Sequence, residues 1–154
     1  MPNDINVVLV HGAWADGSSW AKVIGPLATD AKVLAPPLPL TSLADDIAAL
    51  ERALERLSGP VILAGHAYAG AVIGSARSDK VKALIYVVAL APDEGEKVAD
   101  VFYHNQPHPL APNLAPDSHG LIYLPDEAFA AAFAQNAAED DLQVLRAVQR
   151  PLSA

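Results

Sequence analysis

Four short and almost uninterrupted apolar runs constrain the fold of this chain more than any other feature of its sequence. They occupy residues 5–10, 31–35, 61–64 and 81–90, and segments with helical spacing of apolar residues lie between them. Runs of this kind are typical of strands buried on both faces of a parallel sheet, because helices cover both faces of such a sheet. The alternation predicts an α/β fold with a doubly wound, mainly parallel sheet and a ligand crevice at the carboxyl ends of the strands.

The segments between these runs carry helix signals. Residues 16–19, DGSS, offer turn-forming and capping side chains before an apolar face that begins at Trp20. Ser42, followed three residues later by Asp45, resembles a capping box at the start of a second helix. A further helix is predicted over residues 71–77. The clearest apolar stripe belongs to the second helix and consists of Leu43, Ile47, Leu50, Leu54 and Leu57.

The pattern changes after residue 95. We therefore expect residues 1–95 to form the core and residues 96–154 to form a small, mostly helical cap or lid of the same domain. This second part contains an apolar run at 121–124 that predicts a short strand or hairpin arm. Helical patterns follow over residues 126–136 and 140–149.

Composition narrows the class of protein. A chain of 154 residues with 52% hydrophobic residues is long enough for one compact domain around a buried sheet. Its net charge of -8 makes nucleic acid an unexpected partner, because phosphate groups would be repelled. Cysteine is absent, which excludes disulfides and fits a reducing compartment. The sequence has neither a signal peptide at residues 1–4 nor an apolar stretch long enough to span a bilayer, so we expect a soluble, cytoplasmic protein without a membrane partner.

A motif with chemical meaning follows the third apolar run without a loop. Residues 65–70 read GHAYAG, and a helical pattern begins directly after them. A strand, the sequence Gly-x-Ser-x-Gly and a helix together form a nucleophile elbow, a sharp turn that exposes a serine and needs small flanking residues. Gly65 and Ala69 occupy the small positions, but Ala67 stands at the tip. Because alanine has no oxygen that could attack a carbonyl, covalent acyl transfer through this position is excluded.

Two backbone amides are predicted to face the crevice beside this turn. The loop after the first strand and the turn after the third strand should be neighbours, because the winding of the sheet reverses between them. An oxyanion hole of this type takes one N–H from the residue after the nucleophile and one from the early loop, which here are Tyr68 and Ala13. The helix that begins near Tyr68 adds partial positive charge. The crevice is therefore predicted to favour an anionic group.

Four segments together make the sequence resemble a known family. They are VVLVHGAW at residues 7–14, LPL at 38–40, GHAYAG at 65–70 and YVVALAP at 86–92. On these segments the chain resembles the small α/β-hydrolases related to plant methylesterases and hydroxynitrile lyases, including bacterial esterase-like members. The resemblance implies the α/β-hydrolase fold, a serine nucleophile where Ala67 stands, oxyanion amides at the two residues named above, and a small cap after the fourth strand.

The resemblance also implies residues that this sequence does not contain. In the family, the catalytic acid follows a later strand and the catalytic histidine a still later one, both beyond a segment like residues 149–154. By resemblance, the chain matches the N-terminal portion and lacks all three members of the triad, so we expect it to be catalytically inactive as written. The strand at 81–90 would then have an uncovered edge. We expect a complementing C-terminal segment or self-association to cover it.

Other residues that could carry chemistry have competing structural roles. We expect Trp14 and His66 to line the substrate site rather than to act in catalysis. His11, at the end of a buried strand, is expected to be a structural imidazole, and Trp20 a core residue. Nucleotide binding is not expected, because no Lys with Ser or Thr follows residues 65–70 as a phosphate loop requires. No cofactor or metal is expected either, since ligand spacing is missing from the polar cluster of the second part, His104, His108, Asp117 and His119.

Three functions remain open on the sequence alone. The first is a carboxylic-ester hydrolase with alanine, engineered or natural, at the nucleophile position, whose ligand is a small hydrophobic ester or acid. The second is a non-catalytic small-molecule binding or receptor protein that keeps the hydrolase crevice. The third is a lyase or another reaction on the same scaffold, because a fold alone does not determine the chemistry of its site.

Overall fold

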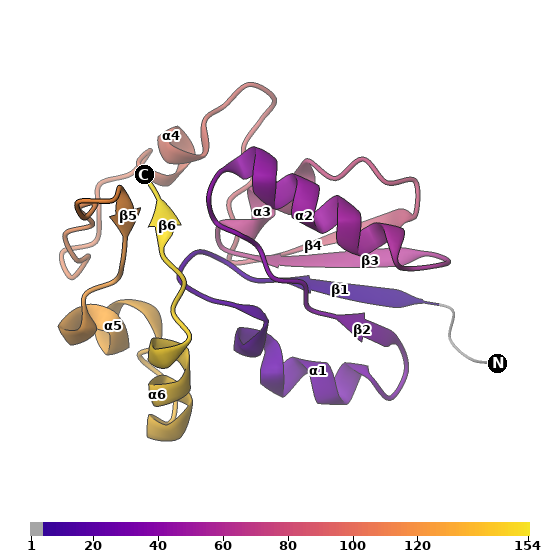
Figure 1. Cartoon of the computed structure of the whole chain (residues 1–154), viewed down its shortest axis with the longest axis horizontal. Helices are drawn as coiled ribbons and strands as arrows, with labels where there is room; N and C mark the ends of the chain where they lie inside the picture. The colour runs from indigo at the N-terminus through magenta and orange to yellow at the C-terminus, as the bar shows by residue number, and fades with distance from the viewer. Residues whose placement is uncertain (1–4) are drawn as a thin grey trace.

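A parallel sheet forms the centre of the computed structural model, which describes residues 5–154 (Figure 1). Residues 1–4, for which the sequence predicts no signal peptide, lie outside the described part. The sheet has the order β2-β1-β3-β4 and all its strands are parallel, which confirms the predicted α/β class. Its strands are β1 (Asn6–Val10), β2 (Lys32–Leu34), β3 (Val61–His66) and β4 (Val81–Val87).

The order of the strands reverses between β1 and β3. From β1 the chain winds to β2 on one side, and it then crosses over to β3 and β4 on the other side. The connections that leave the carboxyl ends of β1 and β3 therefore diverge and open a crevice between them. The loop that carries Ala13 and the turn that carries Ala67 follow these two strands.

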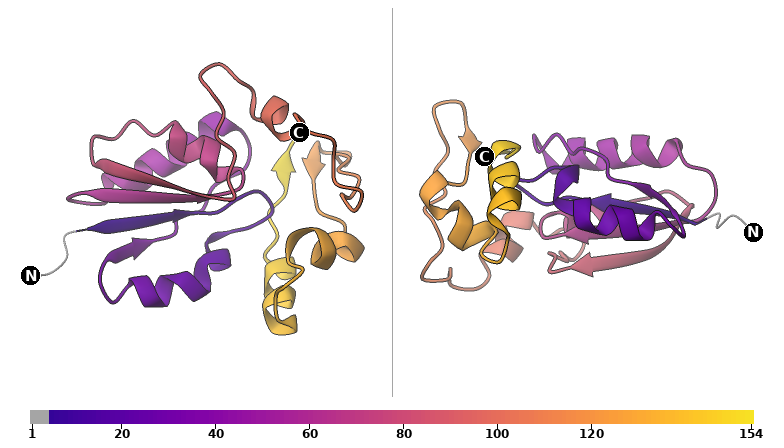
Figure 2. Two further views of the ribbon diagram at one scale, coloured as in Figure 1. Left: turned by 180° about the vertical axis from the view of Figure 1, so that it is seen from behind. Right: turned by 90° about the horizontal axis from the view of Figure 1, so that it is seen from below.

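Helices cover both faces of the sheet, as Figures 1 and 2 show. The short 3-10 helix η1 (Gly17–Trp20) and α1 (Ala21–Leu27) lie on one face, and α2 (Leu43–Glu55) and α3 (Ala69–Gly74) lie on the other. Ser42 caps α2 as predicted, because its hydroxyl accepts a hydrogen bond from the Asp45 backbone N–H at 3.1 Å. The same hydroxyl donates to the Asp45 carboxylate at 2.8 Å.

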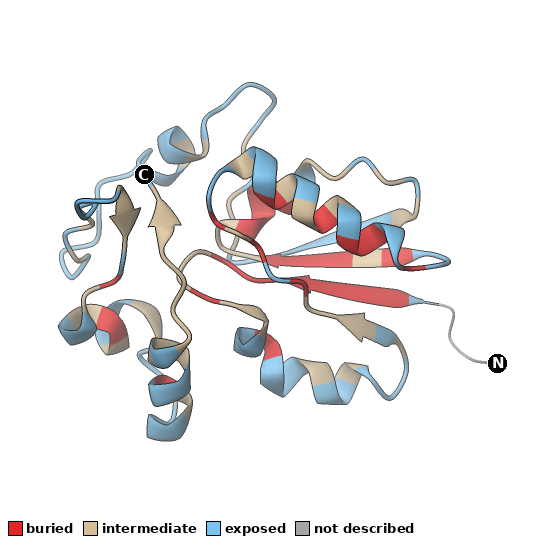
Figure 3. Ribbon diagram, viewed as in Figure 1, coloured by how far each residue is buried: buried red, intermediate tan, exposed pale blue. Residues whose placement is uncertain are grey.

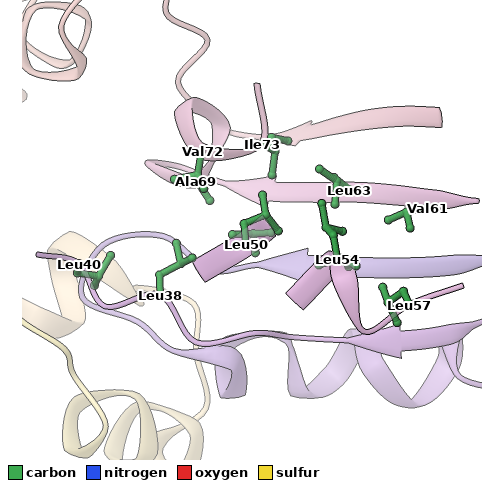
Figure 4. Packing of buried hydrophobic residues seen from close by; sticks show 12 residues of the cluster. Leu38, Leu40, Leu50, Leu54, Leu57, Val61, Leu63, Ala69, Val72 and Ile73 are labelled. Atoms are coloured by element: carbon green, nitrogen blue, oxygen red, sulfur yellow. The ribbon is translucent and has the colours of Figure 1, made fainter. Parts of the chain in front are cut away.

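The predicted apolar stripe of α2 packs into the main core (Figure 4). Leu50, Leu54 and Leu57 are buried there, and Leu43 and Ile47 are partly buried against them. Each fully buried leucine contributes about 1.5–3 kcal/mol relative to an exposed one. The smaller core on the opposite face of the sheet consists of Val7, Leu9, Trp20 and Ala64.

The burial of β4 differs from the prediction. The sequence predicts a strand over residues 81–90 that is buried on both faces, whereas β4 ends at Val87 and most of its side chains are exposed (Figure 3). Ile85, in the middle of the strand, is 48% exposed. The physical reason is its position, because β4 is an edge strand and nothing within residues 5–154 pairs with its outer side.

The second part of the chain lies at the carboxyl ends of β1 and β3 (Figures 1 and 2). It contains α4 (Val98–Phe102), β5 (Leu121–Ile122), α5 (Asp126–Phe133), α6 (Glu139–Ala147) and β6 (Leu152–Ser153). The predicted strand near residue 121 and both later helices are present. The sequence predicted neither α4 nor β6, which pairs antiparallel with β5. In the described part of the chain, no helix is long and apolar enough to cross a membrane.

Several contacts attach this second part to the core. Lys22 of α1 forms an ion pair with Asp141 of α6. The Ser153 backbone N–H donates to the Leu40 carbonyl at 3.0 Å, which joins β6 to the loop after β2. Trp14, from the loop after β1, packs against the buried cluster between α5 and α6.

Candidate active site

Ala67 lies at a sharp turn between β3 and α3. Its φ of 51° is in the left-handed region, which residues other than glycine rarely adopt. The Ala67 N–H donates to the Val87 carbonyl at 3.3 Å. The Ala67 carbonyl accepts hydrogen bonds from the N–H groups of Leu90, at 3.0 Å, and Gly70, at 3.1 Å. The strand, turn and helix predicted around GHAYAG are therefore present, and backbone bonds on both sides hold the turn in place.

Close backbone approaches explain the small residues around this turn. A Cβ atom on Gly65 would lie 2.8 Å from a carbonyl oxygen of α3, and one on Gly70 would lie 2.0 Å from the Leu90 carbonyl oxygen. Both distances are too short for a side chain without backbone movement. A Cβ on Gly12 would lie 3.0 Å from the His66 carbonyl oxygen, so the loop after β1 packs directly against the turn.

The backbone N–H groups of Ala13 and Tyr68 are unpaired within residues 5–154. Ala13 directly follows Gly12 in the loop that packs on the turn, and Tyr68 directly follows Ala67. Both residues line the same cavity. Because backbone donors are nearly always paired in folded proteins, two unpaired donors at a cavity wall are available to an oxygen atom of a ligand.

The cavity has a volume of about 600 Å³ and opens beside the turn. This volume is typical of small-molecule sites, which are concave, mostly apolar and contain a few polar groups. Its wall is mainly apolar, with contributions from α4, α5 and the last residues of the chain. The structure brings together on this wall every site residue that the sequence singles out, namely Ala13, Trp14, His66, Ala67 and Tyr68.

Backbone strain is concentrated around this cavity. Four residues other than glycine have a left-handed φ in the described part of the chain, and all of them line the cavity. They are Trp14 (58°), Leu40 (59°), Ala67 (51°) and Val88 (45°). Each such residue costs roughly 1–2 kcal/mol, which the surrounding contacts have to offset. Residues of this kind cluster at binding and catalytic sites, so the strain supports a functional role for the cavity.

Asp46 is a polar site residue that the sequence analysis missed. It is fully buried, and its two carboxylate oxygens accept hydrogen bonds from the Leu40 backbone N–H at 2.8 Å and from the Tyr68 hydroxyl at 2.6 Å. Burial and the bond to this carboxylate raise the pKa of Tyr68 far above its ordinary value. Asp46 lies four residues before Leu50, on the buried stripe of α2, and this spacing was the signal that could have found it.

The two histidines near the turn have different surroundings. His11 is fully buried, and its Nε2 accepts a hydrogen bond from the Leu38 N–H at 2.9 Å. Its Nδ1 therefore carries the proton and donates to the Gly12 carbonyl at 2.9 Å. Burial lowers the pKa of His11, as expected for a structural imidazole. His66 lines the cavity with its ring edge-on to Trp20, and burial lowers its pKa too.

Trp14 connects the turn region to the second sheet. Its indole Nε1 donates to the Ile122 carbonyl of β5 at 2.9 Å, and its ring lies on the cavity wall. Its left-handed backbone therefore positions a large apolar side chain between the loop after β1 and the second part of the chain.

Asp117, from the polar cluster of the second part, holds a turn of the backbone. Asp117 accepts hydrogen bonds from the backbone N–H groups of His119, at 2.8 Å, and Leu121, at 2.9 Å, and these bonds lower the pKa of its carboxyl group. Among residues 5–154, no group of three or more His, Cys, Asp or Glu side chains is placed to hold a metal ion.

Comparisons with known proteins support the fold. A model of the alpha/beta hydrolase family matches residues 7–154. A search of curated proteins found no significant match.

Several solved structures share the fold. A variant of tomato methylketone synthase I in complex with β-ketoheptanoate superimposes with a TM-score of 0.77 at 20% identity, over 96% of this chain and 67% of that one. A serine-to-alanine variant of a pyrethroid hydrolase gives a TM-score of 0.71 at 24% identity, over 86% of this chain and 62% of that one. A pyrethroid hydrolase from Sphingobium faniae gives 0.62 at 21% identity, over 88% and 63%. This chain thus spans roughly two thirds of the length of these proteins.

Proposed function

This chain belongs to the alpha/beta hydrolase family, and we propose that its cavity is the acyl-binding site of a carboxylic-ester hydrolase in which alanine stands at the position of the serine nucleophile. The observation that carries the proposal is the left-handed Ala67 between two unpaired backbone donors. The turn holds residue 67 at the cavity wall, and the N–H groups of Ala13 and Tyr68 belong to the two segments on either side of it.

This arrangement suits ester chemistry. In a serine hydrolase, the nucleophilic hydroxyl attacks the ester carbonyl, and the carbonyl oxygen becomes an anion that two N–H groups stabilise. The N–H groups of Ala13 and Tyr68 would serve as those donors. With a methyl group at residue 67, a ligand can bind and its carbonyl can be polarised, but no acyl group can be transferred to this position.

The cavity wall favours a small hydrophobic ester or carboxylic acid. It is mainly apolar, and the unpaired donors lie beside Ala67. A carboxylate or ester carbonyl could accept bonds from these donors while its apolar part contacts the wall. The tomato methylketone synthase structure holds β-ketoheptanoate, which supports a carbonyl acid as the ligand type for this fold.

We assign residues 96–154 the role of a cap over this site. Phe102 of α4, Leu114 of the connecting loop and Phe133 of α5 line the same cavity as the turn. Their apolar surfaces would exclude water from a bound ester and strengthen the bonds to the amide donors.

One observation favours a second function, which is binding without catalysis. Ala67 itself removes the nucleophile but leaves the two donors and the cavity in place. A binding or receptor protein would need only these features. The two functions make different predictions once an oxygen is restored at residue 67.

The test is the reactivity of an Ala67→Ser variant toward p-nitrophenyl acetate. Donors and binding alone leave roughly 10³–10⁴-fold acceleration over water when members of a catalytic triad are missing, so slow acylation of residue 67 is expected. Intact-mass spectrometry and peptide mapping measure the adduct. The unchanged protein is the control, and Ser75 at the end of α3 is an internal reference hydroxyl.

Faster acylation at residue 67 than at Ser75 supports the ester-hydrolase site. Equal labelling of both hydroxyls contradicts it. Saturable binding of the ester without acylation of residue 67 favours the non-catalytic binding protein.

A further inference from the structure

A buried carboxylate, that of Asp46, belongs to the wall of the cavity but has no charged partner. The residue is fully buried, and among residues 5–154 no Lys, Arg or His side chain forms an ion pair with it. Removing a carboxylate from water is costly unless hydrogen bonds satisfy its oxygens. The explanation for an aspartate at this position therefore lies in the hydrogen bonds that it makes.

Two donors converge on Asp46, and they come from different segments of the cavity wall. One carboxylate oxygen accepts from the Tyr68 hydroxyl at 2.6 Å, and the other accepts from the Leu40 backbone N–H at 2.8 Å. A carboxylate presents two acceptor oxygens and no donor, whereas the side chain of asparagine presents one acceptor oxygen and one donor nitrogen. Aspartate thus matches the two donors, and asparagine in the same orientation satisfies only one of them.

The same carboxylate is connected to the last strand of the chain through Leu40. The backbone of Leu40 has a left-handed φ of 59°, and its carbonyl accepts a hydrogen bond from the Ser153 N–H of β6 at 3.0 Å. Leu40, Tyr68 and Ser153 all line the cavity. One buried side chain of α2 therefore joins the turn after β3, the loop after β2 and, through Leu40, β6.

The turn at residue 67 is held from two sides, and Asp46 provides one of them. On the side of β4, the N–H and the carbonyl of Ala67 form hydrogen bonds with the backbone of Val87 and Leu90. On the side of α2, the Tyr68 hydroxyl donates to Asp46. The backbone N–H of Tyr68 has no acceptor within residues 5–154. The direction of this donor therefore depends on its neighbours in the turn and on its anchored side chain.

We propose that Asp46 is a positioning residue for ligand binding, whose carboxylate anchors Tyr68 so that the backbone N–H of Tyr68 points at an oxygen of the ligand. This inference rests on the proposed function, which places that oxygen beside Ala67. It goes beyond the proposed function because it assigns a role in binding to a residue of α2 that supplies neither the nucleophile position nor a donor.

The two donors of the site should respond differently when this anchor is lost. Asp46 holds Tyr68 directly, whereas Ala13 belongs to the loop after β1 and has no bond to Asp46. Loss of the anchor should therefore misplace the N–H of residue 68 and leave that of Ala13 in position. A merely structural role of Asp46 would lower stability but would leave both donors and the affinity of the folded protein unchanged.

The test is a titration with butanoate that is followed by nuclear magnetic resonance at the amides of residues 13 and 68. Tyr68→Phe removes a single oxygen atom and with it the bond to Asp46. This variant is expected to bind butanoate at least about fivefold more weakly. The downfield shift of the residue 68 amide at saturation should be smaller than in the unchanged protein, and that of Ala13 should be kept.

Two further variants separate anchoring from a direct contact between the ligand and the Tyr68 hydroxyl. Asp46→Asn should weaken binding as well, and the double variant should bind no more weakly than the weaker of the two single variants, because both changes break the same bond. Tyr68→Phe alone carries the test if Asp46→Asn does not fold. Tyr123→Phe is the matched control, since Tyr123 is 46% exposed and does not line the cavity, and it should bind like the unchanged protein.

Two results overturn the positioning role. One is a folded Tyr68→Phe variant that matches Tyr123→Phe in affinity and in the shift of the residue 68 amide. The other is a double variant whose losses of affinity are additive. Failure of the proposed function gives a different result, because the amides of Ala13 and Tyr68 then do not respond to butanoate even in the unchanged protein, and Asp46 has no ligand-binding donor to position.

Discussion

Asp46 and Tyr68 form a polar contact that supports the candidate site. The Tyr68 hydroxyl donates to Asp46, and Asp46 also holds the Leu40 backbone N–H. The hydrogen bond thus fixes the side chain of a residue whose backbone N–H is one of the two donors in the proposed site. Supporting side chains of this kind determine whether a backbone donor is correctly placed, because the geometry of a catalytic or binding site depends on the groups that surround it.

The contributions of these two side chains to the free energy of unfolding should therefore be coupled. Tyr68→Phe leaves a carboxylate oxygen of Asp46 without its donor, and Asp46→Asn removes an acceptor from Tyr68 or Leu40. Each change is expected to lower the free energy of unfolding by about 1–3 kcal/mol in urea titrations. The double variant should lose less than the sum of the two, by about 0.5–3 kcal/mol.

Tyr103→Phe is the matched control, since Tyr103 is 61% exposed and should stay within about 0.5 kcal/mol of the unchanged protein. Strictly additive losses at Asp46 and Tyr68 would mean that the hydrogen bond between them does not contribute.

At these residues, sequence reasoning succeeded where the signal was local. The motif GHAYAG and the loop after the first strand predicted the neighbourhood of Ala67, Ala13 and Tyr68, because the winding of a parallel sheet determines which loops meet. The sequence analysis missed Asp46 because a carboxylate in the first turn of a helix is usually solvated, where it interacts favourably with the helix dipole. Only the contact with Tyr68, from another part of the sequence, explains its burial.

Among the helices and strands, the prediction was accurate where the apolar period was long enough to be distinctive. The runs that became β1 and β3 and the stripe of α2 lie in the core as expected. The five residues of α4 and the two of β6 are too short to carry a period. The sequence analysis overestimated the burial of β4. An apolar run shows that a strand is suited to pack against other elements, but it does not show whether those elements are present.

The exposed side of β4 predicts self-association of this chain. An apolar edge strand with unpaired N–H and carbonyl groups can pair with another strand. Ile85→Lys adds a charge to this edge, because Ile85 is 48% exposed, and is expected to shift the chain toward the monomer. Sedimentation velocity over a hundredfold range of concentration measures the effect.

Val144→Lys on α6 is the control, since Val144 is 52% exposed but lies far from β4 in sequence and on another element. An unchanged protein that stays monomeric throughout this range would contradict the prediction, as would equal effects of the two substitutions.

For the whole molecule, the buried His11 and the half-buried His66 predict a dependence of stability on pH. Burial lowers the pKa of His11 and of His66 in the folded state. The unfolded chain then binds more protons as the pH falls through about 6.5, the ordinary value for histidine. The contribution is fully present above that pH and is lost below it, so the free energy of unfolding should fall between pH 7.5 and 5.5.

Urea titrations at these two values measure the slope. His66→Gln should make the pH dependence shallower. A pH dependence that is the same in the unchanged protein and in this variant would show that other groups cause it.

The proposed site can be tested most directly by nuclear magnetic resonance, through the amide signals of Ala13 and Tyr68 during a titration with butanoate. Both N–H groups are unpaired within residues 5–154 and line the cavity at Ala67. If they bind an oxygen of the ligand, both proton signals should move downfield and saturate with a single dissociation constant. Saturable binding of butanoate that leaves both of these signals in place would contradict the site.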